Sequence, residues 1–238
     1  MFPLKDDIPS NTFPVVNIGL IAVNFLFFLM ELEAGQDFER LVFALGFVPG
    51  RFMSGFAENW LNIKIFLPVF SSMFLHGGIL HLVSNMWMLW IFGDNVEDCM
   101  GHGRYLFFYL LCGVISVFAQ AAAGPGSQVP LIGASGAISG VLGAYFLTYP
   151  RARVLTLIPI FILFYTIELP AYFFLGFWFF MKFLQGSASL ATIGNAQGGI
   201  AFWAHVGGFG AGVLLIHLFR RTDWQKTIQR KSVRLTRI

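Results

Sequence analysis

Residues 129–150 read VPLIGASGAISGVLGAYFLTYP, an apolar helix that opens unexpectedly with the flexible stretch GASG at 133–136. Counting back from Tyr149 to Ser135 gives 15 residues, which corresponds to about 22 Å of helix against a hydrocarbon core of about 30 Å. The helix is too short to cross, so its first turn is expected below the outer surface. Unpaired backbone N–H groups at that depth require surrounding protein and a water-filled cavity. Ser135 would lie where these donors and the positive end of the helix dipole converge.

The composition identifies the chain as an integral membrane protein. Of its 238 residues, 57% are hydrophobic and 11% are charged. The mean hydropathy is +0.72, which is well outside the usage of soluble domains. Cys99 and Cys112 have no obvious disulfide partner and are expected to be structural. The N-terminus is a poor cleaved signal, so the first apolar run is expected to remain as a span.

The distribution of apolar segments predicts an all-α membrane protein with six transmembrane helices, and the fourth helix starts inside the membrane. The expected spans are approximately 13–31, 77–95, 104–123, 135–149, 168–185 and 200–219. With the N-terminus inside, the inner segments hold eleven Lys and Arg residues and the outer segments hold four. This asymmetry favours an N-in, C-in topology.

The same pattern divides the chain into three parts: a cytoplasmic N-terminus (1–12), a six-helix membrane domain (13–219) and a basic cytoplasmic tail (220–238). The tail contains seven basic residues and one acid. Such a tail is expected to contact the anionic lipids of the inner leaflet, and nucleic-acid binding is the less favoured alternative.

Three connections between the spans are unusual. Residues 32–76 form a long outer loop that is too apolar for open water and is expected to lie in the membrane interface. Residues 154–167 contain Pro159 and precede Pro170, so they are expected to form an interfacial segment instead of a further span. Residues 186–199 are small and uncharged, as in a mobile outer loop.

Small residues form a stripe on each of two predicted helices. One stripe follows Ser135 and the other lies beside His205, and together they contain Gly136, Gly140, Gly208 and Gly212. Glycine stripes allow membrane helices to approach closely, and packing these two faces together brings Ser135 near His205. A simpler interpretation is that GASG is only a packing seam.

A histidine inside a membrane is energetically unfavourable, so His205 is a functional candidate, with a satisfied core histidine as the alternative. A serine hydroxyl needs a nearby base to become a nucleophile, and imidazole is the usual base. Glu168 belongs to the inner side, so no carboxylate is expected at this depth. The pattern therefore favours a catalytic dyad of Ser135 and His205 without an acidic third member.

The second span opens with HGGILHLVSNM (76–86), which places His81 and Asn85 four residues apart on one helix face. Together with the Ser135 backbone N–H, these side chains suit donation to a developing oxyanion. His76, at the loop boundary, is expected to fix the local backbone. A metal site of His76, His81 and His205 is the disfavoured alternative, because the chain has no H-E-x-x-H motif and no ligand carboxylate nearby. No metal and no cofactor is expected.

The set HGGILHLVSNM, FGDNVED, GASGAISG and AHVGGFGAG, in this order, resembles the rhomboid intramembrane serine proteases of the basic six-helix type. The resemblance runs from about residue 66 to 215. It implies Ser135 as nucleophile, His205 as general base, and an oxyanion hole of His81, Asn85 and the Ser135 backbone. It also implies single-span membrane proteins as substrates, cleaved near the outer membrane face, with residues 186–199 as a cap.

Two positions depart from the family pattern. Some members carry a tyrosine one turn after the nucleophile, stacked on the base, whereas this chain has Ser139, so His205 must be oriented differently. The Trp-Arg pair often found in the first outer loop is also absent, because Leu61 follows Trp60. These two departures change how the first outer loop is anchored and how His205 is oriented. They do not change the Ser135–His205 dyad.

Two other functions compete with an intramembrane protease of a prokaryotic cell (inner) membrane. One is a catalytically inactive rhomboid-like protein that binds membrane clients, which the intact GASG stretch and both histidines disfavour. The other is a channel or transporter with histidines in a glycine-lined cavity. This second alternative does not explain a serine at a helix N-terminus opposite a base.

Overall fold

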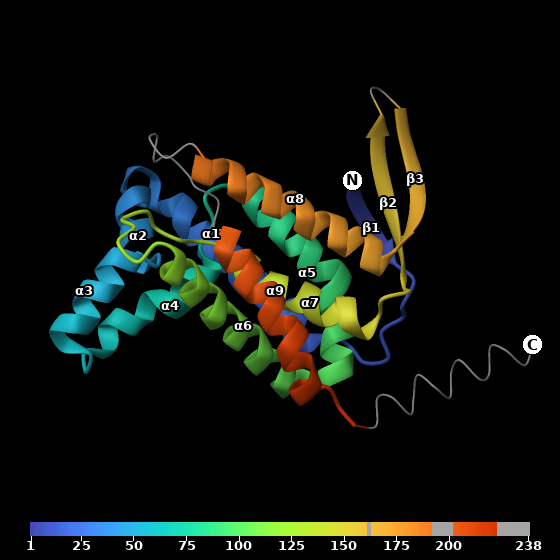
Figure 1. Ribbon diagram of the computed structural model, residues 1–238, viewed down its shortest axis with the longest axis horizontal. Helices are drawn as coiled ribbons and strands as arrows, with labels where there is room; N and C mark the ends of the chain where they lie inside the picture. Colours follow the sequence, from blue (N-terminus) through green and yellow to red (C-terminus); the bar gives the residue numbers. More distant parts are fainter. Residues whose placement is uncertain (161–162, 192–201, 223–238) are drawn as a thin grey trace, which may run out of the picture.

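The computed structural model describes residues 1–160, 163–191 and 202–222, and helices dominate it (Figure 1). The long helices pack side by side as a bundle, and the shorter ones gather at the end where α1 finishes. The helices are α1 (Val15–Ala34), α2 (Phe38–Leu45), α3 (Pro49–Asn59), α4 (Leu67–Ser71), α5 (Ile79–Met100), α6 (His102–Ala123), α7 (Ser135–Thr148), α8 (Ala171–Ala191) and α9 (Phe202–Phe219).

Each of the six segments expected as a span overlaps one helix, namely α1, α5, α6, α7, α8 or α9. By length and composition, Val15–Leu45, α6 and α9 can each cross a membrane, and joining α5 to Ile63–Phe74 across an 81° bend adds a fourth candidate. α7 has only 14 residues, which corresponds to about 21 Å. The chain is therefore an integral membrane protein with several helical spans.

A three-stranded antiparallel sheet accompanies the helices, so the expectation of an all-α protein is wrong in this part. β1 (Phe2–Asp6) pairs with β2 (Arg153–Ile160), and β2 pairs with β3 (Leu163–Pro170). The β2–β3 hairpin projects from the bundle beside the start of α8 (Figure 1). Most of the segment expected to be interfacial, 154–167, is therefore strand.

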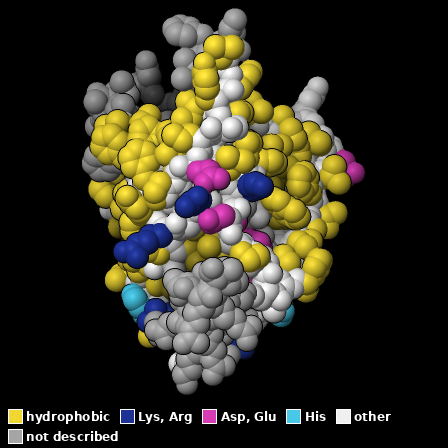
Figure 2. All heavy atoms as spheres, turned by 90° about the vertical axis from the view of Figure 1, so that its right-hand side faces the viewer, with side chains coloured by type: hydrophobic (Ala, Val, Ile, Leu, Met, Phe, Trp, Pro, Cys, Tyr) yellow, Lys and Arg dark blue, Asp and Glu magenta, His cyan; other side chains and the backbone are white. Residues whose placement is uncertain are grey.

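The residue types of the hairpin explain why it forms and why its pattern was missed. β-branched and aromatic residues favour strands, but the run is apolar on both faces and shows no alternation. Pro159 looked like a breaker, yet it pairs with Phe164 near the tip, where a missing N–H costs little. At the base, Arg153 forms a 3.2 Å ion pair with Glu168. Figure 2 shows the molecule from the right-hand side of Figure 1. Charged side chains gather in one zone of that face, with apolar side chains on both sides of the zone.

Helix α8 continues further than the sequence pattern indicated. Residues 186–191 of the expected outer loop are helical, because Ser, Ala and Leu are tolerated in a helix. The remaining part of that loop, 192–199, lies outside the described residues.

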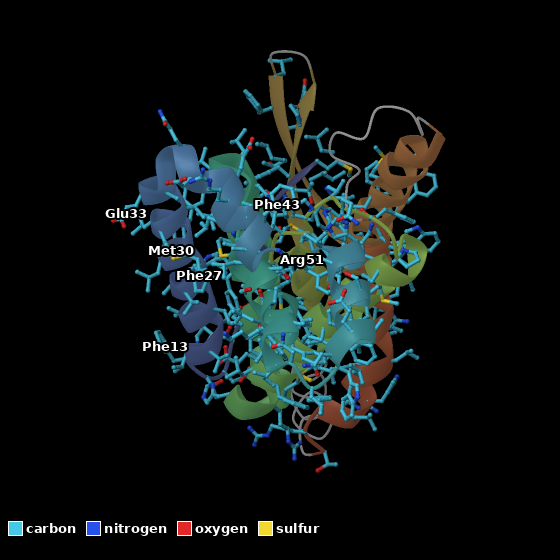
Figure 3. The ribbon with its side chains drawn as sticks, turned by 90° about the vertical axis from the view of Figure 1, so that its left-hand side faces the viewer. Phe13, Phe27, Met30, Glu33, Phe43 and Arg51 are labelled. Carbon is cyan, nitrogen blue, oxygen red and sulfur yellow. The ribbon has the colours of Figure 1, made fainter. Side chains whose placement is uncertain are left out.

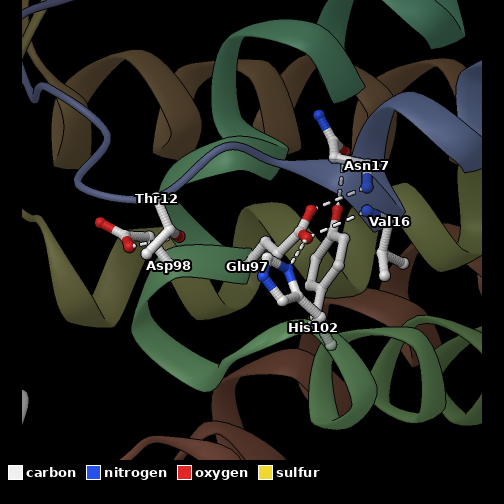
Figure 4. Close-up of polar contacts among 7 residues, drawn as sticks. Thr12, Val16, Asn17, Glu97, Asp98 and His102 are labelled. Carbon is white, nitrogen blue, oxygen red and sulfur yellow. Dashed lines mark hydrogen bonds and ion pairs between the residues drawn. The ribbon is translucent and has the colours of Figure 1, made fainter.

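The C-terminal end of α5 fixes the N-terminal segment through its carboxylates (Figure 4). Glu97 is fully buried and accepts the backbone N–H groups of Val16 and Asn17 at 3.0 and 2.7 Å. It therefore caps the first turn of α1, which has no side-chain cap from its own N-cap residue. Asp98 accepts the Thr12 hydroxyl at 2.8 Å.

Strand β1 is tied to the same end of the bundle. Asp6 accepts hydrogen bonds from the Tyr145 hydroxyl of α7 and, at 3.1 Å, from the Asn95 amide of α5. Burial raises the pKa of the Asp6 carboxyl to about 6. The N-terminal strand thus connects the helix that carries Ser135 to the helix that carries His81 and Asn85.

We expect Glu97→Ala to lower the free energy of unfolding by about 2–5 kcal/mol, because two buried N–H groups lose their acceptor. The exposed Glu33→Ala on α1 is the control and should stay within about 0.5 kcal/mol of wild type. The measurement is the unfolding midpoint in detergent. Equal midpoints for the two variants would mean that Glu97 does not cap α1.

The segment 32–76, which is expected to be an outer loop, is built from short helices and is joined to the strand-like lead into α7. The backbone N–H of Phe47 donates to the Leu131 carbonyl at 3.0 Å, and the N–H of Leu131 donates back at 2.7 Å. Arg51 donates to the backbone carbonyls of Phe43 and Gly46, the latter at 3.1 Å (Figure 3). These contacts anchor a loop that lacks the Trp-Arg pair.

Candidate active site

Ser135 and His205 are in direct contact although 70 residues separate them in the sequence. The Ser135 hydroxyl lies 2.8 Å from the Nε2 atom of His205. Ser135 is the first residue of α7 and is partly buried, whereas His205 lies in the first turn of α9 and is 5% exposed. The arrangement places a hydroxyl donor against a buried imidazole acceptor.

Direct backbone contact between α7 and α9 produces this proximity. A Cβ added at Gly208 would overlap the carbonyl oxygen of Gly136, and one added at Gly212 would overlap the carbonyl oxygen of Gly140. The Gly208/Gly212 stripe of α9 therefore packs against the backbone of α7. The stripe of α7 itself points toward α6, because a Cβ at Gly136 or Gly140 would meet Ser116 or Cys112. Only glycine at 208 and 212 leaves room for the partner backbone, and this closeness places the two helix starts side by side.

The start of α5 contributes a second pair of polar side chains to the same place. Gly133 has a φ of 122°, and a Cβ at this position would lie 2.8 Å from the His81 ring and 3.8 Å from the Asn85 amide nitrogen. His81 and Asn85 therefore flank the backbone two residues before Ser135. The Gly133 N–H donates to the Ser72 carbonyl at 2.8 Å, which holds this backbone in place.

Within the described residues, His81 and Asn85 each keep an N–H group that is not used in a hydrogen bond and can donate to a bound molecule. The Gly77 N–H donates to Nδ1 of His81 at 3.4 Å, which leaves Nε2 as the protonated nitrogen of a neutral ring. Nε2 and the adjacent Cε1 are the His81 ring atoms closest to the position of a Gly133 Cβ, at 2.9 and 2.8 Å. The Asn85 amide nitrogen is buried and has no hydrogen-bond partner among the described residues, so its N–H groups are available to a bound oxygen.

His76 performs the backbone role that the sequence indicated. Its backbone N–H donates to the buried Glu31 carboxylate of α1 at 2.7 Å. This bond ties the turn before α5 to α1 and so positions the helix start that carries His81. The His76 and His81 rings are 5.1 Å apart, but the described residues contain no group of three His, Cys, Asp or Glu that could hold a metal ion.

The polar groups open into one cavity of about 490 Å³. Its walls are the first turns of α5, the segment 129–132 before α7, and Trp178 and Lys182 of α8, with Ser135 and His205 at its base. A cavity of this kind can supply water to helix ends that lie below the membrane surface. It also leaves room for an extended peptide next to the Ser135 hydroxyl.

Ser139 occupies the position that holds a tyrosine in some rhomboids, and its side chain makes a different contact. The Ser139 hydroxyl donates to the Ser135 carbonyl at 2.7 Å and does not contact the base. Trp178 lies edge-on to the His205 ring, with centroids 6.3 Å apart. Nδ1 of His205 is buried without a hydrogen-bond partner in the described part of the chain, so packing orients this ring.

Three residues near the site were missed from the sequence. Gly133 was noted only as part of a flexible stretch, and its positive φ is visible only in three dimensions. Trp178 was one aromatic residue in an apolar run. Lys182 was counted only among the outer charges that set the topology, although a cation inside a predicted span was itself a signal.

Comparison with known proteins agrees with this geometry, since the family model of the rhomboid domain matches residues 64–222. The chain belongs to the rhomboid family. It is 29% identical over 181 residues to Presenilin-associated rhomboid-like protein A, mitochondrial, of Danio rerio, covering 72% of this chain and 42% of that protein. It is 35% identical over 136 residues to Rhomboid protease GluP of Bacillus subtilis, covering 57% of this chain and 25% of that protein. This rhomboid thus spans less than half the length of these relatives.

We expect Gly208→Ala to lower the unfolding midpoint of this rhomboid, because the new methyl group forces α7 and α9 apart at a cost of about 1–3 kcal/mol. The matched control is Gly210→Ala on the same helix, where an added Cβ meets nothing within 4 Å. That variant should match or exceed wild type by up to about 1 kcal/mol through helix propensity. Equal midpoints for both variants would contradict close packing at Gly208.

Proposed function

We propose that this rhomboid is an intramembrane serine endopeptidase that cleaves single-span membrane proteins near their outer ends. The observation that carries the proposal is the 2.8 Å contact between the Ser135 hydroxyl and the buried His205 imidazole. Nucleophile and base within hydrogen-bond distance are the requirement for activating a serine. The relative in Bacillus subtilis that is named Rhomboid protease GluP adds support.

The proposed reaction begins with proton transfer from Ser135 to Nε2 of His205 as the serine oxygen attacks the substrate carbonyl carbon. His205 then donates this proton to the leaving amine as the peptide bond breaks, which leaves an ester on Ser135. A water molecule attacks the ester while His205 accepts its proton, and His205 then returns this proton to the Ser135 oxygen as the ester bond breaks and the acid product leaves. Two groups suffice for each step, in line with a dyad that has no carboxylate member.

The negative charge on the carbonyl oxygen needs donors that are already in position. The backbone N–H of Ser135, Nε2–H of His81 and the Asn85 amide are the proposed donors. Their support is the position of both side chains against Gly133 and the unpaired, buried amide of Asn85. The start of α7 adds the positive end of its helix dipole.

The proposed topology has six helices crossing or entering the membrane, with both termini cytoplasmic and Ser135 in the outer half. The excess of basic residues on the inner segments supports it. We propose the cell membrane of a prokaryote as the location, with membrane lipids as partners of the basic tail. The same proposal divides the chain into a cytoplasmic N-terminus (1–12), a six-helix membrane domain (13–219) and a basic cytoplasmic tail (220–238).

The main alternative is an inactive rhomboid-like protein that binds membrane clients in the same cavity. The short contact between Ser135 and His205 argues against it, because client binding does not need a base next to a hydroxyl. A conducting function is also disfavoured, because conduction does not need a serine hydroxyl held 2.8 Å from a histidine.

Purified wild type should cleave a model single-span substrate, and Ser135→Ala and His205→Ala should each reduce turnover to near background. Each loss should be nearly complete because nucleophile and base act as one unit. Ser84→Ala removes another serine of the cavity and should retain turnover. If Ser135→Ala cleaves at the wild-type rate, the protease assignment is excluded.

Asn85→Ala should lower the rate of the chemical step by roughly 10²- to 10³-fold, the effect expected for one oxyanion donor. Turnover and unfolding midpoint are measured on the same detergent preparation. A purely structural asparagine would instead show a lowered midpoint with unchanged turnover per folded molecule. That outcome would remove Asn85 from the oxyanion hole.

A further inference from the structure

Lys182 is a cation within the apolar part of α8. It is the twelfth residue of the helix, after AYFFLGFWFFM, so it lies about 17 Å along the axis from Ala171. A charged side chain at such a depth is unfavourable in lipid and normally faces a protein interior or a water-filled cavity. Its position therefore needs a local explanation.

The structure directs Lys182 to the active-site cavity. It is partly buried and lines the same cavity as Ser135 and His205, and it is close enough to His81 and His205 to interact electrostatically. The ion pairs of the described residues do not include Lys182, and the acids among them lie elsewhere. The cavity thus contains a positive charge without a described anion.

Two simpler explanations fit less well. A lysine that extends along the helix to the outer headgroups would present its amine to the lipid interface, whereas Lys182 faces the cavity. The second explanation is that the positive charge of Lys182 keeps His81 and His205 neutral. No lysine is needed for this purpose, because burial already disfavours a charged imidazole. An unpaired cation in a partly dry peptide-binding cavity is suited to receive an anion from the peptide.

We propose that Lys182 binds an acidic side chain of the substrate close to the scissile bond. Preferred substrates would then carry Asp or Glu within a few residues of the cleavage site, at the outer end of their membrane span. This inference rests on the proposed protease function and assigns Lys182 to specificity. It adds no step to the reaction, because Ser135 and His205 suffice for that.

The size of the effect follows from the environment of the charge. An exposed ion pair contributes little, whereas a pair at a partly buried site feels a lower effective dielectric constant. We therefore expect an acidic substrate to exceed its neutral analogue by about tenfold in kcat/KM. The preference should weaken at high salt, because screening acts on partly exposed charges.

The experiment uses single-span substrates that differ only in one residue, Asp, Asn or Lys, placed in turn at each of three positions on either side of the scissile bond. The readout is the ratio of kcat/KM for the charged and the neutral substrate. This ratio is measured for wild type, Lys182→Gln and Lys182→Glu. Lys64→Gln is the control, since Lys64 is an exposed cation of the outer segment that does not line this cavity.

At one position at least, wild type and Lys64→Gln should prefer Asp about tenfold, Lys182→Gln should lose the preference, and Lys182→Glu should prefer Lys. The wild-type ratio is informative even if a variant fails to fold. Active wild type without charge preference at any position would overturn the inference while the protease function stands. A shifted pH profile of Lys182→Gln with an unchanged Asp/Asn ratio would also overturn it. Complete absence of Ser135-dependent cleavage would instead reject the protease function itself.

Discussion

The contact of backbone on backbone between α7 and α9 is the constraint on which the site depends. Where Gly208 meets Gly136 and Gly212 meets Gly140, no side chain separates the two helices. Two helices held this closely bring their first turns together, and each first turn carries one partner of the Ser135–His205 contact. The chemistry therefore depends on the absence of side chains at Gly208 and Gly212 as well as on the presence of Ser135 and His205.

The rest of the fold surrounds the Ser135–His205 contact with protein and a cavity, which polar groups inside a membrane require. The free N–H groups at the start of α7 face a cavity, and α5, α8 and the segment before α7 supply its walls. At the C-terminal ends of α5 and α7, Glu97 and Asp6 connect the N-terminal segment to these helices.

Much of this arrangement could be predicted because it depends on helical periodicity. The period of 3.6 residues fixes which glycines share a face with Ser135 and His205, and it places His81 and Asn85 together on α5. The β2–β3 hairpin could not be predicted in this way, since its strands are apolar on both faces and Pro159 suggested a break. Gly133 and Lys182 were missed because their importance depends on a backbone angle and on a cavity wall from distant parts of the chain.

The central claim is that His205 activates Ser135 and no other serine. Mass spectrometry of the protein after reaction with a serine-directed fluorophosphonate tests it most directly, because the adduct identifies the nucleophile residue by residue. The account predicts one adduct, on Ser135, in wild type and its loss in His205→Ala. An adduct on a different serine, or equal labelling of Ser135 in the His205→Ala variant, would contradict it.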